Sequence, residues 1–201
     1  GKYTEPGCYG CDTFDYSAKR VRASIAESME RLGVDYIDIV YLHDFDYAEQ
    51  RHAEEALTEG LAELRRLKDE GSIGAVGAGI YAMDLWKRTI LNGDIDVLLV
   101  HNHYCLNDIR IVELFPLCEA RGIGLVNASP FASGLLTDRG APPWHPADED
   151  ARALFRKAAA MCVERGTSIS KVALQFSTQH PRIPTTLFSS ARPSSVEKNL
   201  S

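Results

Sequence analysis

The chain has 201 residues, of which 45% are hydrophobic and 25% are charged, and its formal net charge is -6 at pH 7. This composition is typical of a soluble globular protein with a sizeable core. An acidic balance without a basic block argues against nucleic acid or a membrane surface as a partner. No apolar run approaches the roughly 20 residues of a membrane helix. We therefore expect a single domain over residues 1–201 and a cytoplasmic location.

The five cysteines form an odd, scattered set: Cys8, Cys11, Cys105, Cys118 and Cys162. Such a set predicts reduced thiols in a cytosolic protein rather than a disulfide framework. Cys8 and Cys11 form a CxxC motif, which is compatible with a redox pair or with half of a zinc site. A second pair with similar spacing is missing, so we favour a glycine-rich loop that holds two thiols.

Helices and strands alternate along the chain. Apolar residues at helical spacing, with serine starts and glycine stops, predict helices over residues 17–31, 49–70, 83–92, 109–121, 149–165 and 168–179. Short apolar runs predict strands over residues 36–43, 72–80, 97–100, 124–127 and 184–188. The final segment has the pattern of a helix start. This order predicts an α/β fold with a parallel sheet and right-handed crossovers.

Polar residues follow every predicted strand, which favours a (β/α)8 TIM barrel over an open doubly wound sheet. Neither a GxGxxG fingerprint nor a Walker loop is found. The strand over residues 36–43 is apolar on both faces and is predicted to be buried on both. It ends in His43, which is either a functional residue at the barrel rim or a residue that bonds a neighbouring backbone group.

Three further strand ends carry polar groups. His101 and His103 form an HxH, and two residues that are two apart on a strand point the same way. With His43 they permit a metal-dependent hydrolase, but the other strand ends supply no histidine or aspartate, so we predict no metal site. Ser129 and Ser133 flank the turn after the fourth predicted strand. Other histidines, namely His52, His145 and His180, are expected to be exposed.

Ser189, Ser190 and Arg192 follow the last predicted strand, before the final helix start. Hydroxyl groups, a guanidinium and the N–H groups of a helix start together suit a phosphate. The alternative, which spacing alone favours, is that Ser189, Ser190 or Ser194 caps the helix.

Several long motifs resemble the aldo-keto reductase superfamily, in particular its branch of L-galactose dehydrogenase and aldose 1-dehydrogenases. They are FDYSAKRVRASIAESMERLGVDYIDIVYLHD, ALTEGLAELRRLKDEGSIGAVG, SPFASGLLT, GAPPWHPA and SSVEKNL. The resemblance implies a (β/α)8 barrel, here incomplete, running from about the end of strand 3 through strand 8. Of the family's catalytic Asp, Tyr, Lys and His, only the histidine is matched, by His43. Gly1, Lys2 and Tyr3 resemble a triplet that follows the catalytic lysine, so we expect this piece to be inactive alone.

The resemblance also implies where the cofactor binds. The loop that wraps the pyrophosphate is matched by Ser129, Pro130, Phe131, Ser133 and Gly134, and the adenosine segment by Ser189, Ser190 and Asn199. His101 falls where many members contact the nicotinamide amide. Gly79 and Ile80 replace a common Ser-Asn pair. Ser195 stands where NADP-preferring members often have an arginine that pairs with the 2′-phosphate. Arg192 and Lys198 could supply that positive charge instead, so the resemblance favours NAD over NADP only mildly.

The implied activity is that of an NAD(P)-dependent oxidoreductase that removes a hydride from C1 of a sugar and gives a lactone. The expected partner is therefore a small sugar or carbonyl substrate, and the resemblance leaves the oligomeric state open. Two alternatives stay open, namely a general NADPH-dependent carbonyl reductase and a nucleotide-binding barrel module without catalysis.

Overall fold

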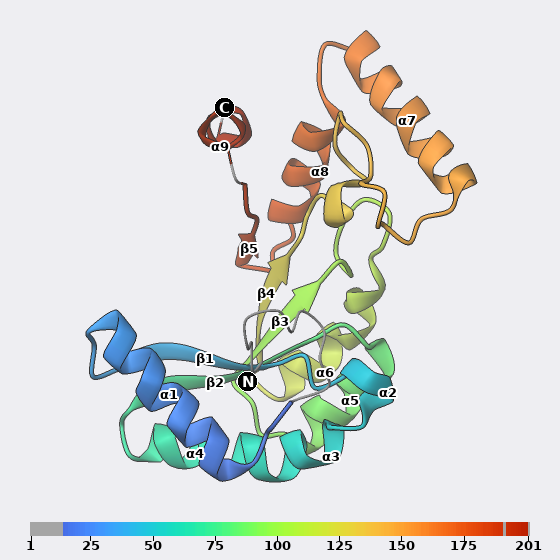
Figure 1. The fold of residues 1–201 in the computed structure, drawn as a ribbon. Coiled ribbons are helices and arrows are strands. Elements are labelled where there is room, and N and C mark those ends of the chain that lie inside the picture. The colour runs from blue at the N-terminus through green and yellow to red at the C-terminus, as the bar shows by residue number, and fades with distance from the viewer. Residues whose placement is uncertain (1–13, 191, 201) are drawn as a thin grey trace. The chain divides into compact units, whose positions relative to one another are not determined.

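The computed structural model describes residues 14–190 and 192–200 (Figure 1). Its five strands are hydrogen-bonded in chain order: β1 (Ile37–His43), β2 (Ile73–Ile80), β3 (Val97–His101), β4 (Gly124–Ala128) and β5 (Thr185–Leu187). β1 pairs with β2 in parallel, and β4 pairs with β5 in parallel. All five predicted strands are therefore confirmed, as is the parallel arrangement.

The chain folds into two compact units. The N-terminal unit comprises the residues up to Leu99 together with Pro116–Gly124, and the C-terminal unit comprises Val100–Phe115 and the residues from Leu125 onward. Each unit is described by itself below. The expectation that residues 1–201 form one domain stays a prediction.

Helix α1 (Ala18–Leu32) begins and ends where the sequence predicts. The Ser17 hydroxyl accepts a hydrogen bond from the Arg20 amide, and Gly33 ends the helix in a left-handed conformation with φ +68°. α1 lies against α4 (Leu61–Asp69), and α4 lies against β2 (Figure 1). Arg22 of α1 bonds both Glu70 and the buried Glu63, so the two helices are tied together by charge.

The prediction of one continuous α-helix over residues 49–70 is wrong. The segment forms α2 (Tyr47–Gln50), α3 (Ala53–Glu55), one π-helical turn (Ala56–Gly60) and then α4. A π turn adds a residue to the helical turn and rotates the face that follows it. Gly60, the last residue of this turn, is buried, and a Cβ there would lie 3.0 Å from Cδ2 of Leu42. Leu57, predicted to be in the buried stripe, is only half-buried.

β1 is less buried than its apolar sequence predicts. Leu42 is buried, but Ile39 is 44% exposed and the His43 side chain is 51% exposed. β1 is the first strand in the sheet order, and within the described residues it pairs with β2 on one side. A strand at such an edge lacks the neighbour whose side chains would cover it.

The remaining helices follow the predictions closely. α5 spans Met83–Asn92, and the predicted helix 109–121 begins as a 3₁₀ turn (Arg110–Leu114) before α6 (Phe115–Ala120). The C-terminal unit adds α7 (Glu149–Glu164), α8 (Ile169–Thr178) and α9 (Pro193–Leu200). Within the described residues, no helix is long and apolar enough to cross a membrane.

The C-terminal unit has an apolar core beneath the turn that follows β4. Its buried members are Cys105, Ala132, Leu135, Leu136, Ile169 and Ala173. Side chains of α7 and of the proline-rich segment before it pack against this cluster. The turn after β4 therefore rests on a packed base, which favours a well-defined conformation.

Candidate functional site

The turn Ser129–Gly134 leaves the end of β4 in a strained conformation. Ser129, Ala132, Ser133 and Gly134 all have positive φ angles, of 64°, 46°, 53° and 103°. L-residues rarely adopt such angles, and they persist where the surrounding structure demands them, often at binding sites. Gly134 is also limited by space, since a Cβ there would lie 3.0 Å from Cδ of Pro142.

The two predicted serines of this turn are joined in one chain of hydrogen bonds. The Ser133 amide donates to the Ser129 hydroxyl oxygen at 3.3 Å, and Asn102 Nδ2 donates to the Ser133 hydroxyl oxygen at 2.9 Å. A hydroxyl that accepts a hydrogen bond still has its own O–H to donate. Both serines can therefore donate a hydrogen bond to an anion such as a phosphate oxygen.

The segment that follows β5 starts beside this turn. The Ser129 amide donates to the Leu187 carbonyl at 3.1 Å, and the rings of Phe131 and Phe188 meet edge to face with centroids 6.1 Å apart. The ends of β4 and β5 are thereby joined, as expected for neighbouring parallel strands.

The other predicted cofactor residues lie further along this segment. Ser189, Ser190 and Arg192 are exposed. The Ser190 hydroxyl accepts from the Arg192 amide at 3.3 Å and donates to the Arg192 carbonyl at 3.2 Å, a local turn just before α9. Asn199 of α9 is half-buried and lines a cavity of about 390 Å³ with Ser168 and Lys171.

The predicted HxH pair is wrong in its geometry. β3 ends at His101, which is exposed, and Asn102 turns the chain with φ +61°. His103 is instead buried, with its Nδ1 2.9 Å from Asp108 Oδ2. The two imidazoles are therefore not successive side chains on one face of a strand. Within the described residues, no group of three or more histidine, cysteine or acidic side chains is arranged to hold a metal.

Asp108 is held as a carboxylate. Burial opposes its ionisation, but hydrogen bonds from Arg110 and His103 outweigh this effect and lower its pKa to about 2. Arg110 reaches both carboxylate oxygens. The loop after β3 is thereby closed by charge-assisted bonds, which fixes the backbone near Asn102.

His43 lies at the end of β1 in the N-terminal unit, as predicted. Its Nδ1 is 2.6 Å from Oδ1 of Asp44, whose side chain is mostly buried. Because an ionised carboxylate only accepts hydrogen bonds, Nδ1 holds the proton. Nε2 is then the ring atom that can meet a substrate oxygen.

Two further residues hold His43 in place. The buried Tyr16 hydroxyl donates to the His43 carbonyl at 2.8 Å. Burial, together with the charges of Asp44, Asp46 and Glu55, raises the pKa of Tyr16. Gly79 stands opposite His43 in the sheet, and a Cβ there would lie 2.6 Å from Cδ2 of the imidazole. Gly79 thus leaves room for the imidazole of His43.

Sequence reasoning missed the contributions of Asn102 and Asp44. Asn102 stands between the two histidines of the HxH, and Asp44 directly follows His43. Both follow the end of a strand, and that position was the available signal. Cys8, Cys11 and the Gly1–Tyr3 triplet lie outside the described residues.

The sequence pattern of the aldo/keto reductase family matches residues 10–201. This chain belongs to the aldo/keto reductase family. Its parallel strands with intervening helices are a section of the family's (β/α)8 barrel. A solved aldo-keto reductase from Bacillus halodurans matches with a TM-score of 0.75 at 24% identity, over 94% of this chain and 62% of that one. The predicted family and fold class are thus confirmed.

Two curated relatives are similar over most of the chain. L-galactose dehydrogenase of Arabidopsis thaliana is 37% identical over 190 residues, which is 93% of this chain and 59% of the relative. D-threo-aldose 1-dehydrogenase of a Pseudomonas species is 30% identical over 92% of this chain and 57% of the relative. The chain therefore spans somewhat under three fifths of the length of these dehydrogenases.

Proposed function

We propose that the chain is part of an NAD(P)-dependent dehydrogenase that oxidises a sugar at C1 to a lactone. Support comes from family membership and from two relatives whose names denote sugar dehydrogenases. The main structural support for a bound cofactor is the pair of serines after β4. Ser129 and Ser133 each accept one hydrogen bond and each retain an O–H donor.

The donors of the C-terminal unit fit a dinucleotide chemically. Two hydroxyl groups suit a pyrophosphate, the Arg192 guanidinium adds a positive charge nearby in sequence, and Asn199 offers an amide to an adenine or ribose edge. The nicotinamide of the bound cofactor supplies the hydride acceptor. His101, at the end of β3, stays the predicted contact for the nicotinamide amide.

His43 is proposed to orient the substrate. With Nδ1–H donated to Asp44, the Nε2 atom of His43 is available to form a hydrogen bond with the reacting oxygen of the sugar. This bond holds the reacting carbon in a fixed direction for the departing hydride.

Cofactor titration tests the proposal directly. We expect the chain to bind NAD⁺ or NADP⁺ and the Ser129→Ala/Ser133→Ala double variant to bind about ten- to a hundredfold more weakly, because two charge-assisted hydrogen bonds are lost. Binding is measured by calorimetry at fixed salt. Titration of NAD⁺ against NADP⁺ also tests the mild lean to NAD.

A matched control is Ser28→Ala, since the Ser28 hydroxyl donates to a backbone carbonyl within α1. This variant is expected to bind the cofactor as the wild type does. Equal affinity of the double variant and the wild type would remove the serine pair from the site.

The substrate is tested on the longer protein that contains this sequence. Oxidation of L-galactose or another aldose to a lactone supports the proposal. Reduction of small aldehydes without aldose oxidation would favour a carbonyl reductase. A third relative supports this alternative, NADH-specific methylglyoxal reductase of Escherichia coli, which is 34% identical over 121 residues.

A further inference from the structure

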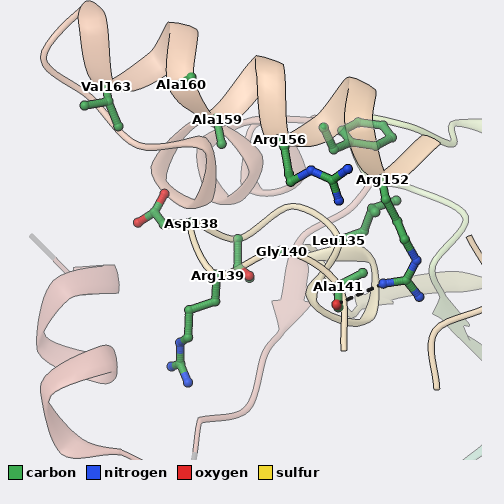
Figure 2. A pocket seen from close by; sticks show the side chains of 12 residues that line it. Leu135, Asp138, Arg139, Gly140, Ala141, Arg152, Arg156, Ala159, Ala160 and Val163 are labelled. Carbon is green, nitrogen blue, oxygen red and sulfur yellow. Dashed lines mark hydrogen bonds between the residues drawn. The ribbon is translucent and has the colours of Figure 1, made fainter. Parts of the chain in front are cut away.

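The proline-rich segment Gly140–Ala147, here called the strap, links the turn after β4 to α7. Its Ala141 and Ala147 pack against the apolar core of the C-terminal unit. A cavity of about 360 Å³ lies between α7 and the start of the strap, with Leu135, Phe155 and Val163 on its walls (Figure 2). The strap is therefore only partly packed against α7, so polar contacts must contribute to its position.

Arg152 of α7 makes those contacts at one end of the cavity (Figure 2). Its guanidinium donates to four carbonyls of the strap, those of Ala141 at 3.1 Å, Pro142 at 3.1 Å, His145 at 2.7 Å and Ala147 at 2.9 Å. The planar fork of arginine can span several acceptors at once, which the single nitrogen of lysine cannot. Arg152 thus fixes the strap along its length.

His145 then connects the strap to the turn, and it is half-buried rather than exposed as predicted. Its Nε2 is 3.1 Å from the Ala132 carbonyl, and its Nδ1 accepts from the Ala147 amide at 3.0 Å. A carbonyl only accepts and an amide N–H only donates, so Nε2 has the proton and Nδ1 has the lone pair. The bond from the Ala147 amide requires the lone pair on Nδ1, and the Nε2–H bond to the Ala132 carbonyl joins the strap to the turn.

We propose that His145 and Arg152 are positioning residues that hold the Ser129–Gly134 turn in its cofactor-binding conformation. His145 bonds the turn directly through the Ala132 carbonyl, and Arg152 bonds the backbone of the strap at His145 and on both sides of it. The inference rests on the proposed function, because it takes the turn to be part of the cofactor site.

The test uses the full 201-residue chain with two variants. His145→Ala removes both ring contacts, and Arg152→Lys keeps the charge without the fork. Arg156→Lys is the matched control, because Arg156 lies one turn along α7 and bonds Glu149 instead of the strap. Hydrogen exchange of the Gly134 and Leu135 amides reports on the turn, and calorimetry at one fixed pH gives the Kd for NAD⁺.

We expect exchange at these two amides to be faster in His145→Ala and in Arg152→Lys than in the wild type, and the Kd for NAD⁺ to rise about tenfold in both. Arg156→Lys should leave both exchange and Kd unchanged. Exchange that does not respond to His145→Ala overturns the inference. Exchange that responds in a chain that binds neither NAD⁺ nor NADP⁺ overturns the proposed cofactor site and leaves the strap's hold on the turn in place.

Discussion

His43 shows how several weak constraints define one side chain. The Asp44 carboxylate holds Nδ1, the Tyr16 hydroxyl holds the backbone carbonyl, and Gly79 leaves room for the ring. Each constraint acts on a different atom, so together they fix both the tautomer and the direction of the imidazole.

Gly79→Ala is predicted to displace the His43 imidazole. The new Cβ would lie 2.6 Å from Cδ2 of the ring, a distance that forces the ring or the strand to move. We expect a loss of about 1–3 kcal/mol in the free energy of unfolding, measured by urea titration, and a changed chemical shift for the His43 ring protons.

Gly124→Ala is the control for this substitution, since it also lies in a strand but its Cβ would meet nothing closer than 3.7 Å. Gly124→Ala should lower the free energy of unfolding by less than about 1 kcal/mol. An unshifted His43 signal in Gly79→Ala would show that the glycine is not what places the ring.

At the scale of elements, the loop after β3 is held by charge. Asp108 contacts His103 and Arg110, and its carboxyl pKa is lowered to about 2 from its ordinary value of 3.8. A group with a depressed folded-state pKa stabilises the fold above its unfolded pKa, and this stabilisation is lost as the pH falls through the folded pKa. The loss therefore occurs between about pH 4 and about pH 2.

Asp108→Asn is predicted to remove this dependence. At pH 7 the variant should lose on the order of 1 kcal/mol of unfolding free energy, since Arg110 is half-exposed and water screens its interaction. Between about pH 4 and about pH 2 its stability should fall less steeply than that of the wild type. Urea unfolding at several pH values measures both effects, and parallel pH profiles would contradict the role given to Asp108.

For the whole molecule, buried thiols report on the two units separately. Cys118 belongs to the N-terminal unit and Cys105 to the C-terminal unit. Burial raises the pKa of each thiol to about 11. Both are therefore protonated and shielded at neutral pH, whereas Cys162 is partly exposed.

Alkylation should accordingly distinguish these three cysteines. With iodoacetamide at pH 7.5 (roughly physiological), we expect Cys162 to react first and both buried thiols to react only as their own unit unfolds in urea. Peptide mass spectrometry gives the extent of labelling at each site. Rapid native labelling of Cys105 or Cys118 would mean that its unit opens readily.

The sequence by itself was sufficient for the order of the elements and most of their ends. Ser17, Gly33 and Ser168 mark helix ends through contacts with residues a few positions away, so the signal is local. The same holds for the family motifs and for the position of His43 at a strand end.

Only the tertiary structure decided the features that depend on distant residues. Gly60, in the π turn before α4, lies against Leu42. Strand β1 is partly exposed because, among the described strands, it is the first in the sheet and pairs on one side. Asn102 bonds Ser133, which lies 31 residues further along the chain. His145 is the clearest case, because its two ring nitrogens bond the Ala132 carbonyl and the Ala147 amide, whose positions depend on how the strap folds back over the turn. Local patterns determine which elements form, whereas the bonds that a side chain makes with distant residues in the folded protein determine its chemistry.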